Sequence, residues 1–236
     1  MCTPIEKRRP TIPNLSGLST GIHDSLPIAL SVFSYGLIFG VLGRQAGMSV
    51  SEAILMSAGG FAGSAQFVAL SMWAAPIPIA TIVATTLVVN LQHVLMGAVL
   101  SPHLRSLPRP LAYAAAFLLT DESWALTIGA TNTGRGSAGY FVGSGLTVYA
   151  AWIGATAAGR MLGGELRDPS HLGLDFAFTA VVAALLTGLW KGKSDVLPWA
   201  VAAVVAAVTH AVLPGKWYIL LGGLIGSIVG VLFRAE

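Results

Sequence analysis

The sequence predicts an all-α, polytopic membrane protein, in which seven to eight hydrophobic segments form a helix bundle. Two observations predict this class. Hydrophobic residues make up 55% of the chain and charged residues only 10%, whereas soluble domains carry about 25% charged residues. The apolar residues are also grouped in runs of about 20, the length that a helix needs to cross the hydrocarbon core of a bilayer.

Charge and cysteine content exclude several classes of protein. The net charge of +3 comes from 13 Lys and Arg against 10 Asp and Glu, spread over the loops without the sustained basic face that nucleic acid requires. Cys2 is the single cysteine, so one chain forms neither a disulfide nor a thiolate metal cluster. We therefore expect a lipid bilayer around the chain, and no nucleic-acid partner, metal or other cofactor.

The chain is expected to begin with a polar tail over residues 1–21, followed by a single transmembrane domain over residues 22–236. The basic run at residues 7–9 would suit the start of a secretory signal. However, the apolar run begins only near Leu26, lacks a cleavage pattern and continues for about twenty residues. We expect this run to be a retained first span.

The helical segments follow from apolar runs that end at proline or glycine. The first run, residues 26–45, follows Asp24, which suits an N-cap, and carries Pro27 in its first turn. The other expected segments are residues 53–74, 77–100, 111–130, 140–158, 172–190, 197–213 and 217–233. The breaks between them contain Pro76, Pro78, Pro102, Pro108, Pro110, residues 132–136, residues 167–170, Pro214 and Gly215.

The second segment is weakened in its middle by Gly59, Gly60, Gly63 and Ser64, directly before Gln66. Interrupted or re-entrant backbone at membrane depth is tolerated only beside protein or water, where its freed groups can hold a ligand. The alternative is that the small residues serve helix packing. A re-entrant second segment brings the distribution of Lys and Arg closer to the positive-inside rule, so we favour seven crossings.

A faint internal repeat relates the second segment to the fourth at a spacing of 56 residues. It would place Gln66 and Glu122 in comparable positions. Transporters built from repeats often place the substrate where broken helices of both halves meet. The matching pairs are Phe61 with Phe117, Ser64 with Thr120, Gln66 with Glu122, Ala69 with Ala125, and Leu70 with Leu126.

The third segment carries Thr86, Asn90, His93 and Gly97 at a spacing that stacks them on one helical face. Asn90 can donate and accept hydrogen bonds to a zwitterionic ligand, and His93 can titrate near neutral pH. The alternative is that both side chains bond neighbouring helices, for about 0.6 kcal/mol each, without touching a substrate.

The fourth segment contains the adjacent acids Asp121 and Glu122 within an apolar run. A carboxylate at hydrocarbon depth costs about 2.5 kcal/mol or more, so it persists where it faces a cavity, pairs or takes up a proton. The pair therefore predicts a proton or substrate pathway. The alternative is a shifted segment, with both acids at an interface where they cap the next helical turn.

The remaining polar positions are weaker candidates. Asp175, near the start of the sixth segment, suits an N-cap, although a role in the pathway stays open. His210 suits a membrane interface. The glycines at residues 222, 226 and 230 form a ridge that packs within the bundle or against a partner subunit.

Four of these stretches together resemble the AzlC-type permease family, the larger component of branched-chain amino-acid exporters. The stretches are residues 61–67 (Phe-Ala-Gly-Ser-Ala-Gln-Phe), 90–93 (Asn-Leu-Gln-His), 120–123 (Thr-Asp-Glu-Ser) and 173–177 (Gly-Leu-Asp-Phe-Ala). The likeness extends from about residue 21 to residue 233. In one departure, Gln92 stands where the family usually carries Arg, which would leave a nearby carboxyl more readily protonated or change the substrate charge that is accepted.

The resemblance implies a transport domain that exports hydrophobic amino acids such as valine, leucine or isoleucine, driven by the proton gradient. It also implies a small companion membrane protein of the AzlD type and a multi-pass place in the cell inner (plasma) membrane. We expect no enzyme activity. The residues predicted to bind substrate or carry protons are Ser64, Gln66, Asn90, His93, Asp121, Glu122 and Asp175.

Two other functions remain open. The chain could be the substrate-binding membrane subunit of a transporter whose ATPase is a separate protein, because no nucleotide-binding loop is encoded. It could also be an intramembrane hydrolase that uses Ser64 with His93 or His210 as base. The Gly-x-Ser-x-Gly motif is absent, which disfavours the hydrolase.

Overall fold

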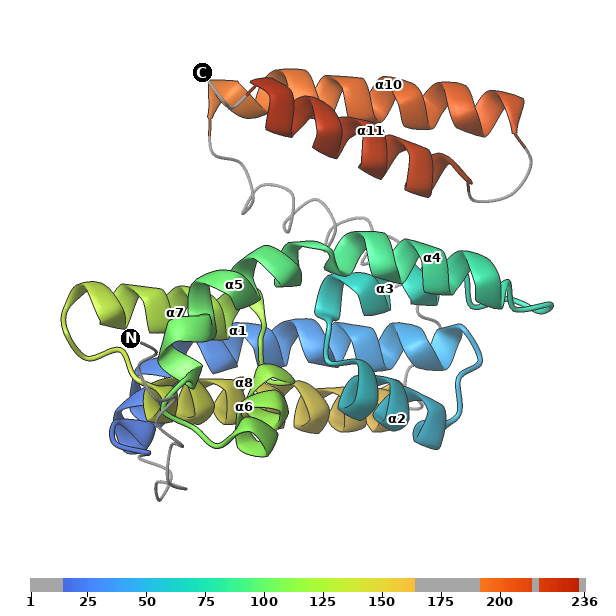
Figure 1. Ribbon diagram of the computed structural model, residues 1–236. Helices are drawn as coiled ribbons and strands as arrows, with labels where there is room; N and C mark the ends of the chain where they lie inside the picture. Colours follow the sequence, from blue (N-terminus) through green and yellow to red (C-terminus); the bar gives the residue numbers. More distant parts are fainter. Residues whose placement is uncertain (1–14, 164–191, 214–216, 234–236) are drawn as a thin grey trace. The chain divides into compact units, whose positions relative to one another are not determined.

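The computed structural model describes residues 15–163, 192–213 and 217–233, and these residues form helices and connecting turns without a strand (Figure 1). Seven of the eight expected segments lie within these ranges, and each is helical. The predicted all-α class is therefore confirmed. The expected sixth segment, residues 172–190, lies outside the described residues.

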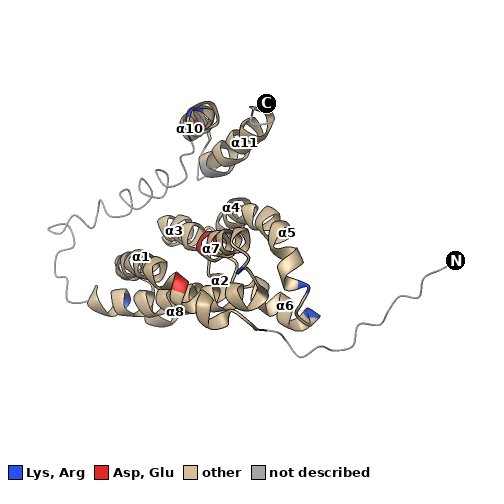
Figure 2. Ribbon diagram, turned by 90° about the vertical axis from the view of Figure 1, so that its left-hand side faces the viewer, with Lys and Arg blue, Asp and Glu red and all other residues tan. Residues whose placement is uncertain are grey.

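Three described helices are long and apolar enough to cross a membrane: α1 (Leu18–Gln45), α8 (Ala138–Leu162), and the span that ends with α10 (Val196–Val212). Helices α4 (Ile79–Asn90) and α5 (Gln92–Leu104) form a fourth candidate if the bent pair counts as one span. Charged residues are sparse along these helices, as Figure 2 shows. Such sparse charge suits helices whose surfaces face hydrocarbon.

The chain divides into two compact units. The first unit comprises Met1–Gly36 and Gln92–Ala155, and the second comprises Leu37–Leu91 and Thr156–Glu236. The first unit contains α5, α6 (Arg109–Ala116) and α7 (Asp121–Asn132), together with the beginnings of α1 and α8. The second contains the ends of α1 and α8 with α2 (Val50–Gly60), α3 (Gly63–Ser71), α4, α10 and α11 (Trp217–Phe233).

Close approach of α1 and α8 depends on glycine within each unit. In the first unit, a Cβ on Gly143 would overlap the carbonyl oxygen of Leu18, and a Cβ on Gly21 would overlap that of Tyr140. In the second unit, a Cβ on Gly40 would overlap the carbonyl of Thr156. Small residues of this kind let membrane helices pack backbone against backbone.

The first unit has an apolar core beneath its shorter helices. Leu100 of α5 and Phe141 of α8 are fully buried in this core. The other members of the core are Leu107, Ala115, Leu118, Leu119 and Ala138. Trp124 of α7 packs against this cluster, so the helix that carries the two acids lies on the core of the first unit.

In the second unit, the glycine ridge of α11 packs on α10. A Cβ on Gly226 would crowd Ala202, and one on Gly230 would contact Pro198, so α10 and α11 run side by side in opposite directions (Figure 1). The ridge therefore packs within the described chain. Helix α4 contacts both α3 and α11.

The second segment is interrupted, as predicted. Helix α2 ends at Gly60, and Phe61 adopts a left-handed backbone with φ 28° before α3 begins at Gly63. The glycines and Ser64 had indicated this position. The left-handed conformation is unusual for a bulky residue, and it falls where the chain must leave one helix and start another.

The expected third segment, residues 77–100, is not one helix. Helix α4 closes with a hydrogen bond from the N–H of Leu91 to the carbonyl of Val88, and α5 starts at Gln92 with a bend of 42° between the two helices. The predicted polar face is therefore divided at Leu91, with Thr86 and Asn90 on α4 and His93 and Gly97 on α5.

The expected fourth segment, residues 111–130, is also broken. Helix α6 ends at Ala116, and Thr120 caps α7: its side chain accepts the N–H of Ser123, whose hydroxyl in turn accepts the N–H of Thr120. This reciprocal capping box starts a new helix because it satisfies backbone donors that would otherwise lack partners. The hydropathy of the sequence does not reveal such a break.

The breaks support the internal repeat. Phe61 directly follows α2 and Phe117 directly follows α6, and the two residues are 56 positions apart. The halves of the repeat also fall in different compact units, since Leu37–Leu91 belongs to the second unit and Gln92–Ala155 to the first. Each unit thus contains an interrupted segment, although α3 begins without the side-chain cap that begins α7.

Helix α1 differs from expectation at its start. It begins at Leu18, after Gly17 with φ 87°, and Asp24 lies inside it with Pro27. The prediction that Asp24 is an N-cap is therefore wrong. The N–H of Leu18 bonds the carbonyl of Leu15, so the helix is already started six residues before Asp24.

Candidate functional site

Gln66 belongs to a buried chain of hydrogen bonds at the α2–α3 break. Its Oε1 accepts the N–H of Ala62 at 3.3 Å, and its Nε2 donates to Ser57 Oγ at 3.2 Å. Ser57 Oγ lies 3.0 Å from Thr156 Oγ1 on α8. Ser57 and Thr156 are fully buried and Gln66 is 4% exposed. The amide of Gln66 thus ties both arms of the interrupted segment to α8, and contact with a ligand stays a prediction.

Ser57 and Thr156 were missed by sequence reasoning. Their signal is only a hydroxyl within an apolar run, which is common in membrane helices where it bonds the backbone of its own helix. The 99 residues between them give no hint that the two hydroxyls meet.

Two further predicted site residues lie in the second unit. Ser64 is exposed in the first turn of α3, and Asn90 is half-buried at the end of α4, which packs on α3. The structure therefore brings Ser64, Gln66 and Asn90 into neighbouring helices of one unit. Asp175 lies outside the described residues.

Asp121 and Glu122 lie in the first turn of α7, in the first unit. Asp121 is exposed and Glu122 is half-buried. The alternative expectation had both acids capping this helical turn, whereas the cap is Thr120 and the acids follow it. Negative charge is favoured there by about 0.3–1 kcal/mol, because the partial positive charge of the helix N-terminus is near. This placement leaves a role of the acids in a transport pathway as a prediction.

Thr120 determines where α7 and its acids begin. We expect Thr120→Val to lower the free energy of unfolding by roughly 1 kcal/mol, because the hydroxyl that accepts the N–H of Ser123 is lost. The midpoint of thermal unfolding in detergent measures the effect. Thr147→Val in α8 is the control, since its hydroxyl bonds only the carbonyl of Gly143 four residues before it. Equal effects of the two substitutions would contradict the importance of the cap.

Asp121 is in contact with Gln92, the residue at which α5 begins. Gln92 Nε2 donates to Asp121 Oδ1 at 3.2 Å and lies 3.4 Å from Oδ2. His93, a predicted site residue, follows Gln92 in the first turn of α5 and is half-buried. The first unit therefore brings His93, Asp121 and Glu122 to the starts of two contacting helices, α5 and α7.

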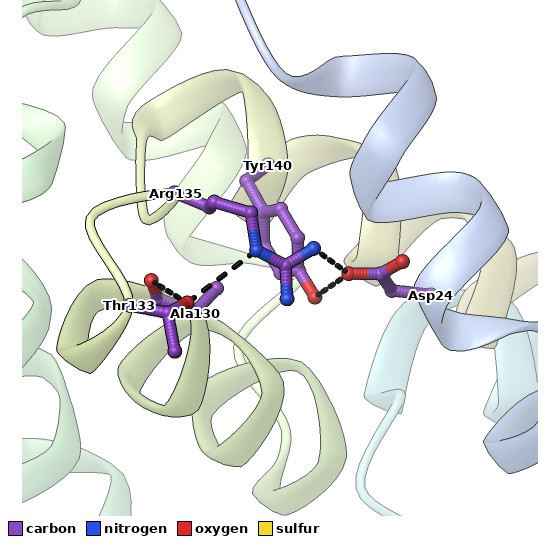
Figure 3. A network of polar contacts seen from close by, with 5 residues as sticks. All are labelled: Asp24, Ala130, Thr133, Arg135 and Tyr140. Atoms are coloured by element: carbon purple, nitrogen blue, oxygen red, sulfur yellow. Dashed lines mark hydrogen bonds and ion pairs between the residues drawn. The ribbon is translucent and has the colours of Figure 1, made fainter.

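Asp24 forms a second polar cluster of the first unit, shown in Figure 3. Its Oδ2 accepts hydrogen bonds from Nη1 of Arg135 at 2.9 Å and from the hydroxyl of Tyr140 at 3.0 Å. Arg135 Nε also donates to Thr133 Oγ1 at 3.4 Å. These contacts attach the α7–α8 connection to α1. Sequence reasoning missed these contacts because it assigned Asp24 as an N-cap, and an N-cap needs no partner more than a hundred residues away.

The described residues contain no group of three or more His, Cys, Asp and Glu side chains that could hold a metal ion. In the stretches that the structure covers, the chemistry is that of carboxylates, amides and hydroxyls at helix breaks. Such groups can bind the ammonium and carboxylate of an amino acid and can exchange protons.

Comparison with known proteins identifies relatives of the chain. The model of the AzlC protein family matches residues 27–166. An uncharacterized membrane protein of Archaeoglobus fulgidus is 32% identical over 73% of this chain and 76% of its own length. The inner membrane protein YgaZ of Escherichia coli is 27% identical over 94% of this chain and 93% of its own.

A further relative is named for transport. The branched-chain amino acid transport protein AzlC of Bacillus subtilis is 27% identical over 70% of this chain and 65% of its own length. No solved structure matches the chain.

Proposed function

This chain belongs to the AzlC family, and we propose that it is a secondary transporter that exports branched-chain or similar hydrophobic amino acids. The observation that carries the proposal is the similarity to the Bacillus subtilis protein, whose name records branched-chain amino acid transport.

Local geometry supports a transport role in physical terms. Each compact unit has an interrupted helix segment with polar side chains at its break: Gln66 and Ser64 in one unit, Asp121 and Glu122 in the other. Broken helices leave backbone groups free to bind a charged solute, and membrane proteins tolerate them where they line protein or water. An amino acid presents the ammonium and carboxylate that such groups recognise.

Proton coupling is proposed because carboxyl groups within apolar segments can change their protonation state at modest cost. The assembly would include a small AzlD-type membrane subunit, and the chain would cross the inner membrane several times. The inner-membrane location agrees with the name of the YgaZ relative.

Flux through reconstituted liposomes tests the proposal. We expect the protein, with its companion subunit when required, to exchange radiolabelled leucine, isoleucine or valine across the membrane without ATP. An imposed pH difference should drive accumulation. Methionine and lysine serve as comparison substrates. Failure to exchange any of these amino acids, or strict dependence on ATP and a separate ATPase, would refute the secondary transporter.

A further inference from the structure

The contact between Gln92 and Asp121 joins two helix breaks of the first unit. Gln92 is the first residue of α5, directly after the break at Leu91, and Asp121 is the first residue of α7, directly after the Thr120 cap. Both side chains are exposed. Because an ionised carboxylate in contact with hydrocarbon is costly, an exposed Asp121 is expected to face water or solute.

A second contact shows that α5 and α7 lie parallel. His103, near the end of α5, has Nε2 2.9 Å from the hydroxyl of Thr131, near the end of α7. With a rise of about 1.5 Å per residue, this contact lies roughly 15 Å along the helices from Asp121. The beginnings of α5 and α7 are thus held side by side, which fixes Gln92 opposite Asp121.

An amide partner suits a carboxyl group that gains and loses a proton. In the observed contact, Oδ1 of Asp121 accepts the Nε2–H of Gln92, as an ionised carboxylate can. When a proton from water forms an O–H bond on one carboxylate oxygen, that O–H can donate to Oε1 of Gln92 while Nε2 donates to the remaining C=O. Gln92 neither gains nor loses a proton in this exchange, so the carboxyl keeps its place in both states.

The first unit contains several other ionisable side chains. Arg135 pairs with Asp24, and among the described residues Gln92 is the hydrogen-bond partner of Asp121. Glu122 shares α7 with Asp121, and α5 carries His93 and His103. Titratable residues on the other elements of this unit's core are Arg109 and Tyr113 on α6 and Tyr140 and Tyr149 on α8.

We propose that Asp121 carries the coupling proton and that Gln92 is the positioning residue that holds its carboxyl in both protonation states. This inference rests on the proposed proton-coupled transport, and it selects Asp121 over Glu122. Gln92 then sets the pH at which the transporter binds its proton.

Opposite shifts in pH dependence test this role. In Gln92→Arg a guanidinium faces Asp121 and favours the ionised form, so the pH of half-maximal gradient-driven accumulation should fall by about 1 unit or more. In Gln92→Leu the donor to the carboxylate is lost, so the same midpoint should rise. A residue that serves only to hold the fold would not move the midpoint in two directions.

Asp121→Asn mimics the permanently protonated carboxyl. We expect it to keep leucine counterflow, which needs no net proton movement, and to lose gradient-driven accumulation by about tenfold or more. Glu52→Gln is the control, because Glu52 is an exposed acid in the first turn of α2 and a glutamine there can still accept the N–H of Ser49. This variant should keep the pH profile of the unmodified protein.

The outcomes separate the inference from the proposed function. If the unmodified protein shows no counterflow, the transporter proposal fails. If counterflow is present but Asp121→Asn still accumulates substrate, or both Gln92 variants keep the original midpoint, the role assigned to Asp121 and Gln92 is overturned. Should Gln92→Arg not fold, the upward shift in Gln92→Leu and the loss in Asp121→Asn decide the question.

Discussion

Replacing Gln66 with leucine is expected to lower the free energy of unfolding by about 1–3 kcal/mol. The substitution preserves apolar volume but removes both bonds of the buried amide, to Ala62 and to Ser57. The N–H of Ala62 then loses its side-chain partner at the start of α3, where no side chain of the N-cap residue replaces it. Loss of these bonds should also loosen the attachment of the interrupted segment to α8.

Ser64→Ala is the control for this prediction. Ser64 lies in the same helix two residues earlier but is exposed. Chemical unfolding in mixed micelles, followed by circular dichroism, compares the two variants. A Gln66→Leu protein as stable as Ser64→Ala would show that the buried chain through Ser57 and Thr156 contributes little. Bonds between membrane helices average only about 0.6 kcal/mol, so an effect above 1 kcal/mol would indicate that the chain acts as a unit.

Substitution of Gly143 by alanine is expected to destabilise the protein by roughly 1–3 kcal/mol. The new Cβ would overlap the carbonyl oxygen of Leu18, which is backbone and cannot rotate away. Helices α1 and α8 must therefore separate within the first unit, and other contacts along this pair, such as that at Gly21, are lost together.

Gly154 in the same helix provides the matched control. A Cβ on Gly154 meets nothing within 4 Å, so Gly154→Ala should be neutral or stabilise by up to about 1 kcal/mol, since alanine favours helix over glycine. Thermal unfolding midpoints of the two variants, measured in one detergent, show whether each substitution stabilises or destabilises the protein. Two equal midpoints would contradict backbone contact between α1 and α8 at Gly143.

Sequence reasoning identified the setting of some predicted site residues but not that of others. Reasoning from the sequence placed Gln66 beside a helix interruption, and α3 does begin at Gly63. It placed Asp121 and Glu122 inside one continuous span, whereas they lie in the first turn of α7. It missed the partners, Ser57 and Thr156 for Gln66 and Gln92 for Asp121. The participation of these residues in substrate binding or proton transfer stays a prediction that the flux experiments address.

The sequence by itself determined the fold class and the places of most helical segments. It did so because residues that lie in hydrocarbon must be apolar, which the composition along the chain reveals directly. Runs of about 20 apolar residues must form helices there, and the last expected segment coincides with α11 at residues 217–233. The interruption near Phe61 was also readable, since clustered glycines weaken a helix locally.

Only the tertiary structure decided where the other helices break and which polar groups meet. The breaks at Leu91 and after Ala116 arise from local hydrogen bonds and a capping box, which average hydropathy does not register. Asp24 and Arg135 lie 111 residues apart, and Gln92 and Asp121 lie 29 apart. Which of these groups come together depends on how helices pack, and packing is set by close-range shape, such as the glycine contacts of α1 and α8, rather than by hydrophobicity.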